Sequence, residues 1–182
     1  YFNDKGFPDF NSNYDIIEKI SNENLKESNE TNSDFIGMIK QTNQKVLITQ
    51  FELNENMDFQ YEKHFLLKLN HQNIICMLDH QIYGSYGYII KPYGISLMHI
   101  LKNIDLDQEC WLKIIKEILK VIDYLQRLDI THNNIALQNI IFTVSDINEF
   151  IDSKNRINDI LRIINFSSAR EKMFLTDTNF RS

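Results

Sequence analysis

The sequence has little of what several classes of protein depend on. Only two cysteines, Cys76 and Cys110, occur in 182 residues, which argues against a disulfide framework and favours a reducing compartment. Both lie in apolar stretches, so we expect reduced cysteines in a core. No apolar run approaches the roughly 18–20 residues that span a bilayer, so no membrane insertion is expected. The formal charge of −6 argues against nucleic acid as the main partner.

An initiator methionine and a signal peptide are also missing. The first ten residues contain neither a basic region nor an apolar core of the kind that directs secretion. We therefore expect an intracellular chain that is processed or truncated, in the cytoplasm or in a cytoskeletal, ciliary or organellar assembly. Residues 1–13 are interpreted as an N-terminal arm.

The residues that are present indicate a globular α+β protein, since 43% are hydrophobic and 12% aromatic. A long helix is predicted over 108–128, where apolar residues recur in alternating steps of three and four. A shorter helix is predicted over 58–69. Strands are predicted at 14–20, 35–40, 45–53, 73–78 and 87–94, followed after the long helix by two short strands.

One stretch after the long helix, ITHNNIALQNIIF (130–142), is an apolar strand interrupted by a polar turn. Its His132 and Asn139 stand seven positions apart, as in the H-R-D-L-x-x-x-N catalytic loop of protein kinases. Further on, IINFSSAR (163–170) looks like the D-F-G motif. Upstream, residues 61–75 are similar to the kinase C-helix and the turn after it, with Glu62 at the place of the ion-pairing Glu.

The chain therefore resembles protein kinases from about residue 14 to residue 170. This resemblance implies a five-stranded antiparallel N-lobe sheet with one C-helix over 14–93. It also implies the start of a mainly helical C-lobe over 94–182. The chain ends soon after the D-F-G position, so we expect the remainder of a kinase C-lobe to lie outside it. By position, a hydrophobic column between the lobes would use Leu66, Met77, His132 and Phe166.

The kinase positions that handle phosphate and metal carry uncharged residues here. The catalytic Asp corresponds to Asn134, the Asp of D-F-G to Asn165, and the phosphate-binding Lys to Thr49. Further departures are Asn133 for the Arg of the loop, Ala136 for a Lys, and Ser167 for the Gly of D-F-G. The sequence also has no glycine between Gly6 and Gly37, where the kinase glycine-rich loop would stand.

These departures predict loss of catalysis, because phosphoryl transfer depends on positioning and on charges that neutralise the transferring group. An amide cannot take a proton as a carboxylate does, and Mg²⁺ favours carboxylates. A displaced Lys40 or Lys45 would replace only one of the lost charges. We therefore expect no catalytic residue, no cofactor and no metal. The remaining histidines have no metal-ligand spacing: His64, His71, His80 and His99.

Two kinase-like residues are expected to serve structure instead. His132 is interpreted as a core histidine with a hydrogen-bonded ring. Glu62, without a lysine at position 49, is interpreted as a solvated or re-paired helix residue. Without an Arg at position 133, an activation-loop phosphate would lose its usual partner.

The surface gives the remaining expectations. Residues 145–158 form a polar insert, interpreted as a solvated excursion or a docking element. Helix 108–128 has more apolar surface than a monomer leaves exposed, so we expect either that the polypeptide continues over it or that another subunit covers it. Other protein subunits are expected to cover this helix and the C-terminal segment. The leading hypothesis is a catalytically inactive, kinase-like scaffold or structural subunit of a larger assembly. The alternatives are a divergent kinase with a rearranged site and a nucleotide-binding switch.

Overall fold

The structure is a computed structural model that describes residues 13–20, 33–53 and 57–172. The expected arm, apart from Asn13, lies outside the described residues, as do the final ten residues. The described residues form two compact units, 13–59 with 76–93 and 60–75 with 94–172. Residues 60–75 thus group with the second unit, although the expected N-lobe range, 14–93, contains them.

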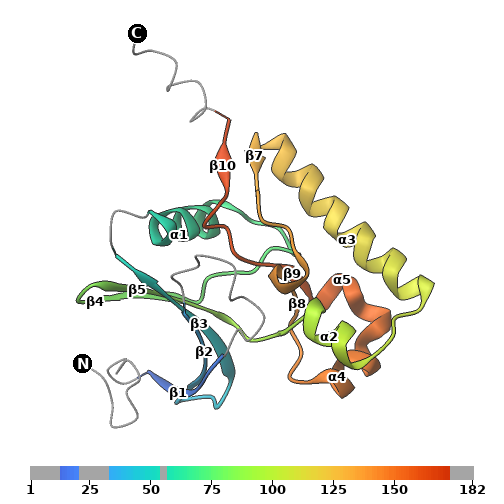
Figure 1. Cartoon of the computed structure of the whole chain (residues 1–182), viewed down its shortest axis with the longest axis horizontal. Helices are drawn as coiled ribbons and strands as arrows, with labels where there is room; N and C mark the ends of the chain where they lie inside the picture. Colours follow the sequence, from blue (N-terminus) through green and yellow to red (C-terminus); the bar gives the residue numbers. More distant parts are fainter. Residues whose placement is uncertain (1–12, 21–32, 54–56, 173–182) are drawn as a thin grey trace. The chain divides into compact units, whose positions relative to one another are not determined.

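The first unit is an antiparallel sheet of five strands in the order β1-β2-β3-β5-β4 (Figure 1). The predicted five-stranded N-lobe sheet is therefore confirmed. Its second and third strands are joined by a turn at residues 41–44, where Asn43 has a φ of 56°. The strands are β1 (Tyr14–Lys19), β2 (Ser33–Ile39), β3 (Lys45–Glu52), β4 (Asp79–Tyr83) and β5 (Tyr86–Pro92).

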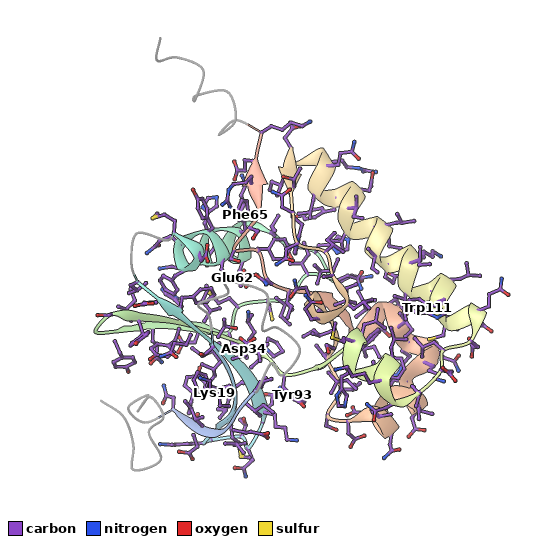
Figure 2. All side chains as sticks on the ribbon, in the orientation of Figure 1. Lys19, Asp34, Glu62, Phe65, Tyr93 and Trp111 are labelled. Atoms are coloured by element: carbon purple, nitrogen blue, oxygen red, sulfur yellow. The ribbon has the colours of Figure 1, made fainter. Side chains whose placement is uncertain are left out.

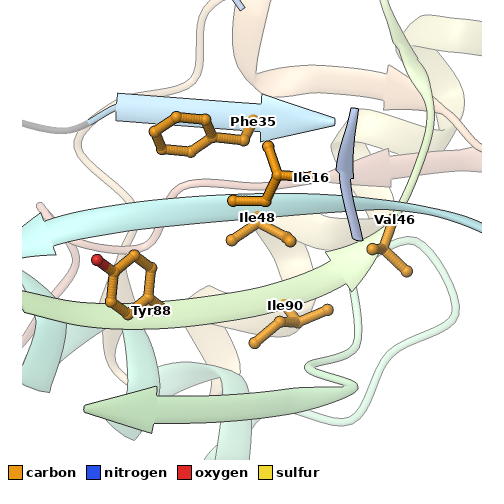
Figure 3. Packing of buried hydrophobic residues seen from close by; sticks show 6 residues of the cluster. All are labelled: Ile16, Phe35, Val46, Ile48, Tyr88 and Ile90. Carbon is orange, nitrogen blue, oxygen red and sulfur yellow. The ribbon is translucent and has the colours of Figure 1, made fainter. Parts of the chain in front are cut away.

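One face of this sheet carries a compact apolar core, because alternate residues of a strand point to the same side. Figure 3 shows the six residues that pack there, all of them at most 8% exposed. They come from four neighbouring strands, so the cluster ties the strands together: Ile16, Phe35, Val46, Ile48, Tyr88 and Ile90.

The second unit contains the predicted long helix, α3 (Gln108–Arg127). It begins where the Asp107 carboxylate accepts a hydrogen bond from the Cys110 amide at 2.7 Å, as a side-chain cap does. Cys110 is buried as expected, whereas Cys76 of the first unit is exposed; both thiols are free. Within the described residues, none of the helices has the length and apolar character needed to cross a membrane.

The other elements of the second unit are short. The predicted helix over 58–69 is confirmed as α1 (Asp58–Lys68). A small sheet has the order β6-β8-β9, and β10 pairs with β7. Their bounds are α2 (Leu97–Asn103), β6 (Ile95–Ser96), β7 (Ile130–Thr131), η1 (Leu137–Asn139), β8 (Ile140–Phe142), β9 (Leu161–Ile163) and β10 (Arg170–Glu171).

The predicted strand over 73–78 is wrong. Only an isolated bridge between Ile74 and Ile163 is present there, and the strand lies further on, at β4. The stretch is apolar because it is anchored to the second unit. The Asn73 side-chain amide donates to the Leu161 carbonyl at 3.1 Å, and the Ile75 amide donates to the Ile163 carbonyl at 3.1 Å.

The polar insert is not a solvated excursion. It folds into α4 (Ile147–Ser153), η2 (Lys154–Arg156) and α5 (Ile157–Ile160). Phe150 is 0% exposed, and its ring lies 4.8 Å from the ring of Phe142 on β8. A few apolar residues among many polar ones are enough to pack the insert against β8.

This packing predicts that Phe150→Ala destabilises the protein by about 3–5 kcal/mol, because it leaves a cavity under α4. The matched control is Ile151→Ala, on the same helix but 43% exposed, which should cost less than about 1 kcal/mol. Urea unfolding of the two variants makes the comparison. Equal losses would show that the insert contributes nothing to the core.

Candidate functional site

The turn that resembles a catalytic loop is fixed by the ring of His132. A carbonyl can only accept and an amide N–H can only donate, so Nε2 donates to the Ile164 carbonyl at 3.1 Å. Nδ1 accepts from the Asn134 amide at 3.2 Å. His132 is 3% exposed and contacts the edge of Phe166, with 4.5 Å between ring centroids. The predicted core histidine with a hydrogen-bonded ring is confirmed.

Beside this ring lies an amide cluster, which consists of the side chains of Asn139, Asn165 and Ser167 and the backbone carbonyl of Asn134. Asn139 Nδ2 donates to the Asn134 carbonyl at 2.9 Å, and Asn165 Nδ2 donates to Asn139 Oδ1 at 3.4 Å. The Ser167 hydroxyl donates to Asn165 Oδ1 at 2.8 Å. The structure thus brings together four of the sequence-predicted positions, all of them uncharged.

The backbone of the site explains why asparagine suits it. Asn133 and Asn165 have φ angles of 62° and 67°, in the left-handed region that asparagine tolerates better than most residues. Asn133 also donates from Nδ2 to the Ser168 carbonyl at 3.1 Å. Ala136 precedes η1 in an extended conformation, with φ at −140°, and adds no polar group.

A magnesium ion does not fit the amide cluster. The two amide oxygens that face the metal-binding positions, Asn139 Oδ1 and Asn165 Oδ1, each already accept a hydrogen bond from within the cluster. The cluster has no carboxylate, the group through which proteins usually hold Mg²⁺. Across the residues that the structure describes, no group of three or more His, Cys, Asp or Glu residues could hold a metal ion.

In the first unit, Thr49 takes the position of the phosphate-binding lysine on β3 and is 7% exposed. Its partner across the strands is Asp34 on β2, so the two Cβ atoms lie about 5 Å apart on one face of the sheet. Asp34 Oδ1 is buried and has no hydrogen-bond partner. The side chain beside Thr49 across the strands is therefore an acidic one and not a lysine.

Lys91 is a residue that the sequence reasoning missed. It is 2% exposed, and it lies opposite Leu47 on β5, so its side chain is on the same face as Thr49. A single lysine inside an otherwise apolar strand was the signal that could have found it.

Lys40 and Lys45, which the sequence analysis considered as replacements for the phosphate-binding lysine, lie elsewhere. Lys45 is exposed, with Nζ 5.4 Å from the centroid of the Tyr93 ring, and Lys40 pairs with Asp15 at 3.3 Å.

Glu62 is not a solvated residue. It comes from α1, as does Phe65 (Figure 2), and it is only 1% exposed. Its position three residues after Phe59 and three before Phe65 puts it on the buried face of the helix. Glu62 thus occupies one of the positions that form the buried face of the helix. The interpretation of Glu62 as a solvated residue is therefore wrong.

A pocket of about 500 Å³ opens beside the turn in the second unit. Its apolar lining comes from the end of α3, from β7 and from the turn, and its polar lining includes Asn133 and Lys172. The apolar residues are Ile122, Leu125, Ile130 and Ile135.

A comparison with protein-family models gives one match over most of the chain. The model described as Protein tyrosine and serine/threonine kinase matches residues 17–172, a range that covers most of both units. A search of curated proteins found no match to the chain.

The buried ring predicts a specific acid sensitivity. Burial lowers the pKa of His132 to about 4, below the roughly 6.5 of an unfolded histidine. Protonation therefore favours the unfolded state, and stability is lost as the pH falls from about 6.5 towards 4. Between pH 7 and pH 4.5 this histidine should account for about 2 kcal/mol of lost stability.

Urea unfolding at the two pH values measures this loss. His132→Gln should remove that part of the loss, whereas His99→Gln, a change at an exposed histidine on α2, should leave it unchanged. The same pH dependence in all three proteins would contradict the buried neutral ring.

Proposed function

Because the chain belongs to the protein tyrosine and serine/threonine kinase family, we propose that it keeps kinase architecture without phosphotransferase chemistry. We propose further that it serves as a scaffold or structural subunit of a larger protein assembly. The observation that carries this proposal is the amide cluster, in which neutral hydrogen bonds join the side chains of Asn139, Asn165 and Ser167 to one another and to the Asn134 carbonyl.

The chemistry of the site supports the loss of activity. Phosphoryl transfer needs cations around the phosphates and a carboxylate that takes the hydroxyl proton. Asn134 stands where that carboxylate would be, and a missing general base commonly costs about two to four orders of magnitude in rate. Thr49 offers no cation, and Asp34 beside it adds a negative charge. The missing base and the missing cation are at separate residues, so a single substitution does not restore both.

The surface of the second unit supports a role in assembly. Four large apolar residues of α3 are between 39% and 60% exposed. Their steps of three, four and three residues place them in one stripe along the helix. The last of them also lines the pocket described above. An apolar stripe continuous with a pocket is typical of a surface that another protein covers. The stripe consists of Leu112, Ile115, Leu119 and Ile122.

The second candidate is a switch that binds a nucleotide without metal. Lys91 favours it, because this buried residue puts a lysine side chain on the face that carries Thr49. Asp34 on the same face opposes it. The two candidates differ in whether the protein responds to nucleotide.

We predict no phosphate transfer from radiolabelled ATP and no change in melting temperature with millimolar Mg·ATP or ATP alone. The reason is that neither unit offers phosphate a matched set of cations and metal ligands. A melting temperature raised by several degrees, and lost in Lys91→Met, would favour the switch. Transfer that disappears in Asn134→Ala or Lys45→Met would show a rearranged kinase.

We also predict that Leu119→Asp releases the protein from its native assembly, because the new charge lies in the middle of the apolar stripe. Size-exclusion chromatography of the native extract measures this as a shift to smaller size. Ile151→Asp is the matched control, since Ile151 is similarly exposed but lies on α4. Identical elution of both variants and the wild type would contradict an interface on α3.

A further inference from the structure

The segment directly after the amide cluster, residues 168–172, is held by hydrogen bonds at several points. Residues 168–172 pair with β7 through β10. The Ser168 carbonyl accepts from Asn133 Nδ2 at 3.1 Å, and the Arg170 carbonyl accepts from Thr131 Oγ1 at 3.3 Å. The Lys172 amide donates to the Asp129 carbonyl at 2.9 Å. This segment therefore has a defined position beside the turn.

Glu171 connects the segment to α1 by charge. One of its oxygens, Oε1, lies 2.8 Å from Lys68 Nζ and 3.2 Å from His64 Nε2. The side chain is only 17% exposed, against 40% for Lys68 and 53% for His64. The hydrogen bond from Lys68, and then that from His64, lowers the pKa of the Glu171 carboxyl, so this carboxylate is ionised at neutral pH.

The neighbouring residue strengthens the same connection. The guanidinium carbon of Arg170 lies 4.3 Å from the centroid of the Tyr61 ring, a cation–π distance. Arg170 NH1 also donates to the Ser167 carbonyl at 3.1 Å and to the Ala169 carbonyl at 2.6 Å, which fixes the guanidinium in place. A cation and an anion on successive residues thus both reach α1.

The residues that α1 presents to this segment share one face of the helix. Tyr61, His64 and Lys68 follow one another at steps of three and four, which is the spacing of side chains on a single helical face. These contacts are built from residues that belong to the second unit. Together they form one continuous set of contacts between α1 and residues 168–172.

We propose that Glu171 is a permanent anion that fixes the segment after the amide cluster to α1, in place of a regulatory phosphate. In kinases, phosphorylation orders the activation segment through new pairs with arginine. Here Asn133 stands at the arginine position and holds Ser168 through a neutral bond. The charged attachment lies instead on α1, and the anion is part of the sequence.

This attachment gives α1 and the segment one arrangement that needs no modification. It goes beyond the scaffold role, because it holds with or without an assembly partner. It also explains why two basic residues on the last turns of α1 meet a largely buried carboxylate, while the nearby Lys172–Asp129 pair is 66% and 63% exposed. The first arrangement joins the segment to a helix, whereas the second joins the residues that flank the paired strands β7 and β10.

Hydrogen–deuterium exchange on the full chain tests the proposal. Glu171→Gln should raise the exchange rates of amides in the last turns of α1 and in residues 168–172 by about three- to ten-fold. Asp129→Asn is the matched control, since it removes the exposed pair beside Glu171 without touching α1. It should leave the exchange of α1 within about two-fold of the wild type.

Variants with reversed charges and treatment with a phosphatase complete the test. Lys68→Glu and Glu171→Lys should each speed hydrogen exchange in α1 and in residues 168–172. The double variant, which restores an ion pair, should recover much of the protection from exchange. Treating the native protein with a broad-specificity phosphatase should change nothing. Unaltered α1 exchange in Glu171→Gln would overturn the proposal, and so would a phosphatase-induced loss of protection. Near-ultraviolet circular dichroism confirms that each variant is folded.

Discussion

The ring of His132 is the constraint on which the arrangement of the site depends. Its two nitrogens connect the Asn134 amide to the Ile164 carbonyl, and its edge packs against Phe166. The bond that Nδ1 accepts requires a neutral ring, which burial favours. The turn and the residues after β9 are thereby held at a fixed separation, and the amide groups of Asn139 and Asn165 can meet between them.

A neutral site of this kind is stable without ligands. Carboxylates at positions 134 and 165 would add two like charges to a partly buried site, and like charges without a metal between them repel each other. Asparagines avoid that cost and satisfy one another through hydrogen bonds. The charged groups that do organise this region, Glu171 with Lys68, stand outside the amide cluster and join one element to another. The protein thus combines membership of the kinase family with uncharged residues at Asn134, Asn139 and Asn165.

The sequence predicted most of the framework, because the strands and long helices have clear periodicity and the spacing of His132 and Asn139 is specific. It could not predict features that depend on tertiary contacts. Phe150 lies in a polar stretch, yet it forms a core with Phe142. Glu62 and Lys91 are ionisable residues at buried positions, which side-chain type alone argues against. The two-residue strand β10 is too short to give a periodic pattern.

The central claim is that the amide cluster does not hold a metal–nucleotide complex. Nuclear magnetic resonance during a titration with Mn·ATP measures this at the site itself, since the paramagnetic ion broadens the signals of nearby groups. The side-chain amide signals of Asn139 and Asn165 should broaden no more than that of Asn103 on α2. Selective broadening of Asn139 and Asn165 at micromolar Mn·ATP would show that a metal binds there and would contradict the account.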